Sequence, residues 1–280
     1  MSALKNAAET VEAVLSIGKK KTELDFGRHV VLAILAGVYI GFGAALALRV
    51  AGDMNPAWGN ILNFTFGMLF PIGLLMVLIA GASLFTGDVM YLLTSYAGGR
   101  VRGAGVLKVL ALSYLGNFLG SLFLAWLIFK SGAMMAPKGD GTYPLAAYAV
   151  NLANGKTALP FFTAFVRGVI CNWLVCLAIF MSLAAQDGVS KTILMWPPIM
   201  AFVTLGMEHS VANMFFIPLG LFLGSFQAVA ESGVKLSATW GTFLIDNLVP
   251  VTLGNIVGGA FFVGLAYLYA ASRPKTVPES

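Results

Sequence analysis

Apolar residues along the chain fall into six long runs that are separated by short polar stretches. A helix needs about 20 apolar residues to cross the hydrocarbon core of a bilayer. Four runs have about this length, and the second and fifth are too long for one straight crossing. The runs cover about residues 29–50, 63–96, 106–129, 159–185, 193–226 and 247–271. The pattern therefore predicts six membrane-spanning segments in an all-α protein.

Polar residues interrupt both of the long runs near their middle. The second run is interrupted at 81–88 and the fifth at 206–213. Non-helical backbone at membrane depth is tolerated only where it is buried in protein or lines a cavity. Broken helices at corresponding positions of two halves are typical of transport sites. We therefore expect helices two and five to be broken around a pathway for a solute.

The two halves of the chain also resemble each other outside the interruptions. Residues 33–38 parallel 164–169, and Leu-Gly-Asn occurs at 115–117 and again at 253–255. Either short match alone is compatible with chance between Gly-rich helices. The common order of a Gly-containing helix, a broken helix and a Leu-Gly-Asn helix favours a repeat. Because each half holds an odd number of spans, the two halves must be inverted relative to each other.

The composition fits this pattern and excludes several classes of protein. Hydrophobic residues make up 59% of the chain and charged residues only 10%, against roughly 25% in soluble domains. The mean hydropathy is +0.87. So few charges exclude a soluble enzyme, a disordered chain and a nucleic-acid-binding module. No cofactor is expected, and Cys171 and Cys176 in one apolar run predict neither a disulfide nor a metal site.

Lysine and arginine predict the orientation. Eleven of the 17 lie in segments on the same side as the N-terminus, five lie in the opposite segments, and Arg167 lies inside a span. This bias predicts both termini in the cytoplasm and a location in the cell (inner or plasma) membrane. We expect an amphipathic segment at 1–28, a single channel domain at 29–272 and a cytoplasmic tail at 273–280. The first segment either lies against the cytoplasmic entrance or serves as a solvated anchor.

His209 is the sharpest candidate for chemistry, because it lies in the interruption of the fifth run between Glu208 and Asn213. Imidazole titrates near neutral pH, and an ionisable group inside a membrane is a functional candidate by default. The alternative is a structural histidine that binds backbone groups freed by the break. His29, the second histidine, is expected to be an interfacial residue.

Two cations near the fourth run can attract anions. Lys156 precedes this run, where composition alone favours a solvated loop lysine, while Arg167 lies within it. An arginine facing lipid is costly, so Arg167 is expected to face protein, a subunit contact or a pore. Its expected role is structural, in a pair with Asp88 or Glu208.

Thr86 lies in the other interruption, where free amide groups can bind an anion. Bulky apolar residues surround both breaks. They read either as core packing or as constrictions that stop water and ions. These residues are Phe70, Leu74, Leu84, Phe85 and Phe202.

Four segments together resemble the formate/nitrite transporter family. They are residues 78–87, 168–178, 208–214 and 247–255, and they are spread along nearly the whole chain. The resemblance implies an aquaporin-like subunit with broken helices two and five. It also implies a homopentamer in the lipid bilayer, with one substrate pore in each subunit and lipid in the central hole.

The resemblance also implies roles for individual residues. His209 would be the pore histidine and Thr86 its partner on the opposite loop, with Glu208 and Asn213 as support. Lys156 would be a vestibule lysine. The signature asparagine would be Asn172. The outer constriction would consist of Phe70, Phe85 and Phe202, and the inner constriction of Leu74 and Leu84. Asp88 departs from the family pattern, where a neutral polar residue is expected.

The family transports formate, nitrite or hydrosulfide, and formate is the expected substrate, followed by nitrite and then hydrosulfide. The mechanism proposed for the family draws the anion in through Lys156 and relays a proton through His209 to form neutral formic acid. A passive anion channel would use the same residues.

Three other classes remain as alternatives. A water or glycerol channel would carry two Asn-Pro-Ala boxes, whereas the chain has one, at 55–57, away from both breaks. An intramembrane enzyme would need a paired catalytic set, and only His209 and Glu208 are candidates. A non-transporting membrane subunit of a formate-metabolising complex would not need ionisable residues at both breaks.

Overall fold

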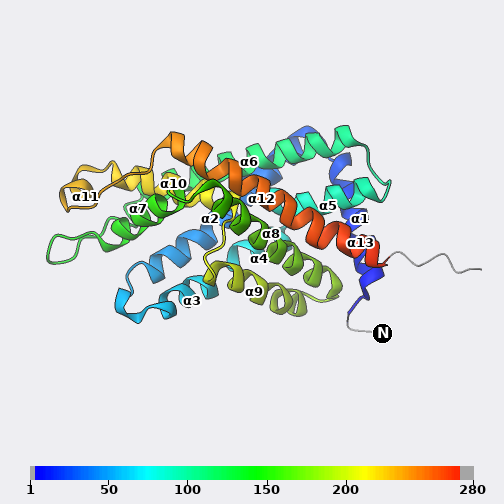
Figure 1. The fold of residues 1–280 in the computed structure, drawn as a ribbon, viewed down its shortest axis with the longest axis horizontal. Helices are drawn as coiled ribbons and strands as arrows, with labels where there is room; N and C mark the ends of the chain where they lie inside the picture. The colour runs from blue at the N-terminus through cyan, green and yellow to red at the C-terminus, as the bar shows by residue number, and fades with distance from the viewer. Residues whose placement is uncertain (1–3, 272–280) are drawn as a thin grey trace, which may run out of the picture.

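The structure is a computed structural model and describes residues 4–271, which form helices joined by loops (Figure 1). In these residues one isolated β-bridge joins Leu4 and Ala185. In chain order the helices are α1 (Ala7–Glu23), α2 (Phe26–Ala51), η1 (Pro56–Trp58), α3 (Asn60–Leu69), α4 (Ile72–Ala80), α5 (Phe85–Ala97), α6 (Gly103–Lys130), α7 (Pro144–Thr157), α8 (Phe161–Ala184), α9 (Gly188–Thr204), α10 (Ser210–Gly224), α11 (Gln227–Glu231), η2 (Thr242–Leu248), α12 (Val249–Gly259), η3 (Ala260–Leu265) and α13 (Ala266–Ala271).

Five helical segments are long and apolar enough to cross a membrane. They are α2, α3 with α4, α6, α8 and the continuous segment from η2 to α13, and α10 is a shorter apolar helix. The predicted second span is therefore α3, α4 and α5, and the predicted fifth span is α9 and α10. Both expected breaks are confirmed, but each is shorter than predicted. Residues 85–88 and 210–213 are already helical, because side chains elsewhere cap the new helices at these points.

Glycines bring the first and third spans of each half into close contact. A Cβ atom on Gly120 of α6 would meet the backbone oxygen of Ile34 in α2. A Cβ atom on Gly258 of α12 would meet the backbone oxygen of Val169 in α8. Small residues let transmembrane helices approach to backbone contact. The repeat predicted from the sequence is thus visible as equivalent helix contacts in the two halves.

The N-terminal helix packs on the end of the bundle where α13 also ends (Figure 1). Asn6 and Glu9 form a capping box at its start, and Asp25 caps the N-terminus of α2. Val11, Val14 and the other buried residues lie on one face of α1, as the amphipathic pattern predicts. The first span begins at Phe26, three residues before the predicted boundary at 29. The predicted tail at 273–280 lies outside the described residues.

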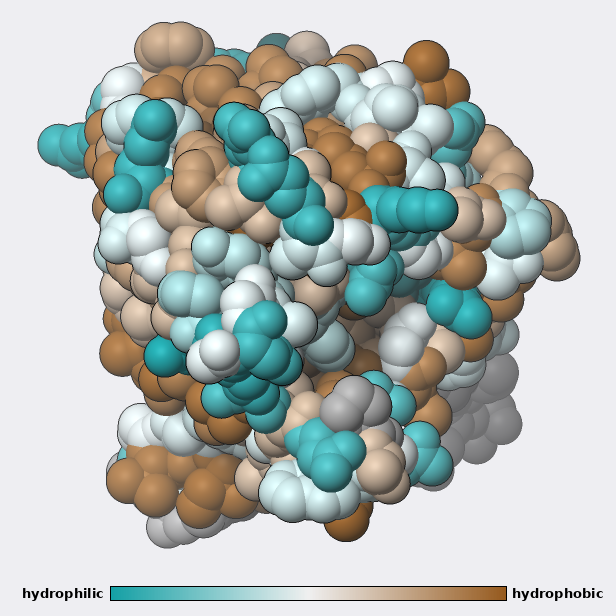
Figure 2. Space-filling model, turned by 90° about the vertical axis from the view of Figure 1, so that its left-hand side faces the viewer, coloured by the Kyte–Doolittle hydropathy of each residue, from teal (hydrophilic) through white to brown (hydrophobic). Residues whose placement is uncertain are grey.

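Large apolar side chains cover the flanks of the bundle, while polar ones gather at its ends. Phe162 is 74% exposed and Leu107 71% exposed, which suits contact with lipid or another subunit rather than with water. Figure 2 shows the end that carries α7 and α11, where hydrophilic residues spread over the face and apolar residues lie at its edges. This distribution is that of a membrane protein.

Replacement of Gly120 by alanine tests the close helix contact. The added methyl group has no room beside the Ile34 carbonyl, so α2 and α6 must separate. We expect a loss of roughly 1–3 kcal/mol of stability and a lower Tm in detergent. Gly155→Ala is the matched control, because no atom lies within 4 Å of a Cβ there. Equal Tm values for the two variants would contradict the packing argument.

Candidate functional site

Asn117 of α6 satisfies the backbone of the first break. Its amide nitrogen donates to the carbonyl oxygens of Ala33 at 2.7 Å and Ser83 at 2.9 Å. Its side-chain oxygen accepts a hydrogen bond from the N–H of Phe85 at 2.8 Å. The side chain therefore joins α2, the loop and the first turn of α5, which otherwise would leave buried backbone groups unpaired.

Asn255 of α12 does the same at the second break. Its amide nitrogen donates to the carbonyl oxygens of Gly168 at 2.8 Å and Glu208 at 3.0 Å. Its side-chain oxygen accepts from the N–H of Ser210 at 2.9 Å. Both asparagines belong to the Leu-Gly-Asn segments. The repeat therefore reproduces the cap of each broken helix, and the caps hold the loops in place.

The two breaks meet at a hydrogen bond between Thr86 and His209. Thr86 Oγ1 and His209 Nε2 lie 2.9 Å apart, and both side chains are buried. His209 is also the N-cap of α10, because its Nδ1 accepts the N–H of Ala212 at 3.1 Å. A nitrogen that accepts a hydrogen bond carries no hydrogen. The neutral ring therefore holds its proton on Nε2 and donates it to the Thr86 hydroxyl.

Two side chains of α8 fix the backbone of Thr86. Asn172 donates to the Thr86 carbonyl at 3.0 Å and to the Asn255 carbonyl at 2.6 Å. The thiol of Cys176 lies 3.3 Å from the same Thr86 oxygen. Cys171 and Cys176 are both free and buried. Asn172 thus links the two halves next to the Thr86–His209 bond, a connection that its place in a sequence motif does not reveal.

Polar side chains support the second break from the side of α7. Lys156 Nζ lies 2.8 Å from Glu208 Oε1, with 13% and 4% of the two side chains exposed. Asn213 donates to Glu208 Oε2 at 2.6 Å and to the Asn247 side-chain oxygen at 2.8 Å. Asn247 donates in turn to the Lys156 carbonyl at 2.9 Å. Lys156 is therefore no solvated loop lysine. Asn247 was missed as a site residue, although it lies in a segment that matches the family.

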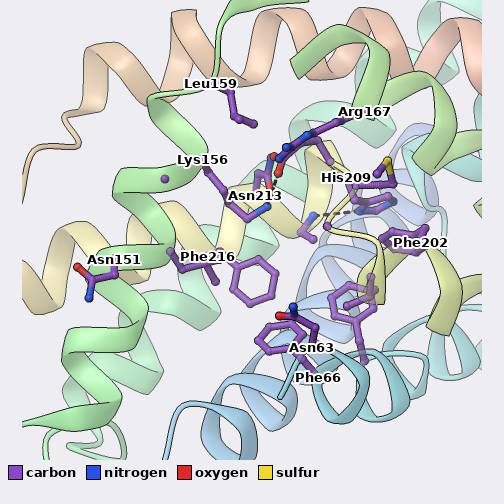
Figure 3. Close-up of a pocket in the computed structure, with 18 of the residues that line it drawn as sticks. Asn63, Phe66, Asn151, Lys156, Leu159, Arg167, Phe202, His209, Asn213 and Phe216 are labelled. Atoms are coloured by element: carbon purple, nitrogen blue, oxygen red, sulfur yellow. Dashed lines mark hydrogen bonds and ion pairs between the residues drawn. The ribbon is translucent and has the colours of Figure 1, made fainter. Parts of the chain in front are cut away.

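A cavity of about 320 Å³ lies on one side of the Thr86–His209 bond, and we call it the Lys156 vestibule. Its charged lining residues are Lys156, Arg167 and Glu208, and His209 lies at its inner end. In Figure 3 Lys156, Asn213, Arg167 and His209 lie along one side of the cavity, with Phe66 and Phe216 across from them, while Asn63 lies beside Phe66 and Asn151 lies apart. The cavity is therefore a mixed polar and aromatic chamber that ends at the histidine.

Aromatic rings narrow the inner end of the Lys156 vestibule. The rings of Phe70 and Phe202 meet edge to face with centroids 5.9 Å apart. Phe202 lies 6.0 Å from the His209 ring. Phe85 instead packs on Tyr114, at 4.9 Å, and lies outside the lining of this cavity. The structure thus brings two of the three expected aromatic residues together at the cavity.

A second cavity of about 320 Å³ lies on the other side of the break, and we call it the Lys21 vestibule. Leu84 and Gly87 line it, whereas Leu74 is buried nearby without lining either cavity. Because Gly87 follows Thr86 directly, the Thr86–His209 bond lies in the partition between the two cavities. The expected roles of all these residues in transport stay predictions.

Two lining residues of the Lys21 vestibule, Lys21 and Asp88, belong to a buried polar cluster that was not predicted from the sequence. Lys21 Nζ lies 2.8 Å from Asp88 Oδ1, and their side chains are 14% and 1% exposed. Ser83 donates to Asp88 Oδ2 at 2.7 Å and accepts from Lys21 at 2.9 Å. His29 Nε2 lies 3.3 Å from the Ser83 hydroxyl and is buried rather than interfacial. In the sequence, the only indication of this cluster was the pair of Ser83 and Asp88, five residues apart at the first break.

The expected pairing of Arg167 is wrong, because each candidate carboxylate already binds a lysine. Asp88 pairs with Lys21 across the bundle end, and Glu208 pairs with Lys156. Among residues 4–271, no group of three or more His, Cys, Asp and Glu side chains is placed to hold a metal ion.

A sequence model of formate/nitrite transporters matches residues 8–269. The chain belongs to the formate/nitrite transporter family. This confirms the resemblance read from four segments of the sequence. Members of this family have the aquaporin-like fold of six spans, so the predicted fold class is confirmed as well. The protein is therefore a membrane-embedded transport protein of this family and not an enzyme.

Relatives in the formate/nitrite transporter family differ in substrate. A probable formate transporter of Methanothermobacter thermautotrophicus is 41% identical over 279 residues, covering 96% of this chain and 97% of its own. The nitrite transporter NirC of Escherichia coli (strain K12) is 36% identical over 247 residues, covering 87% of this chain and 85% of its own. A solved pentameric formate channel with formate bound has a TM-score of 0.75 at 31% identity, covering 87% of this chain and 96% of its own.

Asp88→Asn tests whether the buried ion pair holds α1 on the bundle. The substitution leaves the Lys21 ammonium facing a neutral amide in a mostly buried place. Loss of one partner of a buried pair costs roughly 3–5 kcal/mol, so α1 should detach more often. We expect faster hydrogen–deuterium exchange across Ala7–Glu23.

The control for this experiment is Glu12→Gln, which removes an exposed pair with Arg100. Both of those side chains are at least half exposed, and such pairs contribute little. Exchange in α1 that is the same in Asp88→Asn and in the unaltered protein would show that the Lys21 pair does not anchor the helix.

Proposed function

We propose that the protein is a channel for the small monovalent anions of weak acids, with formate as its main substrate. It acts as a homopentamer in the cell (inner or plasma) membrane, with one pore in each subunit and both termini in the cytoplasm. The pentamer is supported by the solved relative described as pentameric. The exposed apolar flanks also offer ample surface for subunit contacts.

The observation that carries this proposal is the hydrogen bond between Thr86 and His209 in the partition between two vestibules. A solute that passes from one cavity to the other must cross this partition. The bond joins the only histidine at a break to a hydroxyl at the opposite break. In this place it offers polar contacts to a solute where the surrounding residues, such as Phe202 and Leu84, are apolar.

Charge sets the physical problem that the pore must solve. Removal of an unpaired anion from water into a narrow apolar passage costs several kcal/mol or more. The net positive charge of the Lys156 vestibule first concentrates formate. In the vestibule, formate then takes a proton from a hydronium ion of the entry side and becomes formic acid, and a water molecule is released. The neutral acid crosses between Phe70 and Phe202 at a far smaller desolvation cost.

The geometry of His209 refines the role expected for it. Its Nδ1 is occupied by the Ala212 amide, and its single proton on Nε2 cannot be given away without forming an imidazolate. We therefore assign His209 the role of a neutral hydrogen-bond donor, together with Thr86, to the oxygen of the passing acid. The proton that neutralises formate comes from hydronium on the entry side, so transport should rise as the pH of that side falls.

Nitrite is the second candidate, because a relative 36% identical to the chain is described as a nitrite transporter. Nitrite and formate are both small, bent, two-oxygen anions, and the mechanism above applies to both. Hydrosulfide is the third candidate. A non-transporting membrane subunit is the alternative of another class, and it predicts no flux of any of the three anions.

Flux into proteoliposomes across a range of external pH tests the proposal. The unaltered protein should conduct formate faster at acidic pH. His209→Phe removes the donor and should lower formate flux roughly tenfold, because a hydrogen bond between neutral groups contributes up to about 1.5 kcal/mol. If formate flux through the unaltered protein did not change with external pH, passage as the neutral acid would be contradicted.

His209→Asn separates the donor role from a proton relay. Asparagine is among the best N-cap residues and keeps an N–H donor, so this variant should retain part of the flux and its acid stimulation. A relay that requires imidazolium would be abolished as fully as in His209→Phe. Equal loss in both variants, with the elution volume of the oligomer unchanged, would overturn the donor assignment.

A further inference from the structure

Arg167 is the single charged residue of α8, the apolar helix that runs from Phe161 to Ala184. Its side chain lines the Lys156 vestibule together with Lys156 and Glu208 (Figure 3). Its backbone oxygen faces the N–H of Glu208 at 3.4 Å, directly beside the second break. A charge at this depth is costly unless it serves a cavity or a partner.

Within residues 4–271, no carboxylate forms an ion pair with the Arg167 guanidinium. Glu208 is the acidic residue of this vestibule, and both of its oxygens are in use. Lys156 takes Oε1 at 2.8 Å, and Asn213 takes Oε2 at 2.6 Å. The charges of Lys156 and Glu208 therefore cancel. Arg167 is the surplus positive charge that the vestibule presents to an entering anion.

We propose that Arg167 is a specificity-determining residue that binds planar anions with two oxygens and ranks formate and nitrite above hydrosulfide. This inference rests on the proposed channel function and deepens it. It concerns the capture of the anion in the vestibule, before the proton is taken up and the partition is crossed.

The chemistry of the guanidinium group sets this preference. It holds five N–H donors in a rigid planar fork and stays charged at every physiological pH. The two oxygens of formate or nitrite match two parallel donors of this fork. Hydrosulfide has a single sulfur, which is a weak acceptor and can engage the positive charge but not the fork. A lysine at the same place would act as a point charge without this preference.

The Lys21 vestibule provides an internal comparison. Its lining includes Lys21 and Asp88, which cancel, and Lys191 as the remaining cation. Both vestibules thus carry one surplus positive charge, but only the Lys156 side offers a fork. The preference for two-oxygen anions should therefore act on anions that enter from the Lys156 side.

Arg167→Lys tests the fork because it keeps the charge. Flux of formate, nitrite and hydrosulfide into proteoliposomes is measured against anion concentration. We expect the half-saturating concentrations of formate and nitrite to rise roughly tenfold, while that of hydrosulfide changes less than about twofold. Arg167→Gln, which removes the charge, should weaken entry of all three. Lys191→Gln is the matched control and should affect the three anions to the same extent.

A binding measurement keeps this test independent of conduction. Formate should raise the Tm of the detergent-solubilised oligomer, relative to chloride at equal ionic strength. The rise should survive in His209→Phe and largely disappear in Arg167→Lys. A channel that conducts none of the anions yet shows this pattern would refute the proposed function and support the fork. If Arg167→Lys changed the half-saturating concentrations of formate, nitrite and hydrosulfide equally, or changed none of them, the proposed preference of Arg167 for anions with two oxygens would be overturned.

Discussion

The whole arrangement depends on the need to satisfy backbone polar groups where two helices break inside the membrane. Hydrocarbon offers no water to the freed N–H and C=O groups, and each one left unpaired is costly. Asn117 and Asn255 meet this need with the same three contacts in each half: two to carbonyl oxygens and one to an amide. Only because these caps hold can Thr86 and His209 stand opposite each other.

A second constraint is the charge brought in with the polar loops. Asp88 and Glu208 each lie beside a break, and each is almost fully buried. A buried carboxylate is tolerated when a cation and hydrogen bonds accompany it. Lys21 and Lys156 supply the cations at 2.8 Å in both cases. The breaks are therefore polar without carrying net negative charge, which an anion pathway could not accept.

Much of the fold could be predicted from the sequence, because bilayer thickness fixes the length of each apolar run and polar interruptions mark the breaks. His209, Thr86 and Lys156 were found for the same reason: polar groups are conspicuous against an apolar background. The cluster of Lys21, Asp88, Ser83 and His29 was missed. Lys21 belongs to a helix that reads as an exposed amphipathic segment, and its contact with Asp88 spans 67 positions (88 minus 21). Local pattern carries no information about such a contact.

The partner of Arg167 was mispredicted for a similar reason. The sequence suggested a carboxylate partner, but contacts between residues far apart in the chain decide which cation binds each carboxylate. Composition shows how many carboxylates are present, but not which lysine or arginine forms an ion pair with each of them. Two lysines on helices outside the core of the repeat, α1 and α7, reach the carboxylates and leave the arginine without a carboxylate partner among residues 4–271. The assignment of partners is thus a property of the packed helices and not of the sequence segments.

The origin of these two lysines has a consequence for how such a pore can diversify. The breaks and their asparagines belong to the duplicated halves, so a change in either one disturbs the shared architecture. Lys21 comes from a helix that precedes the first half, and Lys156 from the helix that links the halves. The lysine at each entrance therefore comes from a helix outside the two repeated halves. Substitutions in α1 or α7 can change the charge at one entrance of the pore while the packing of the two repeated halves is preserved.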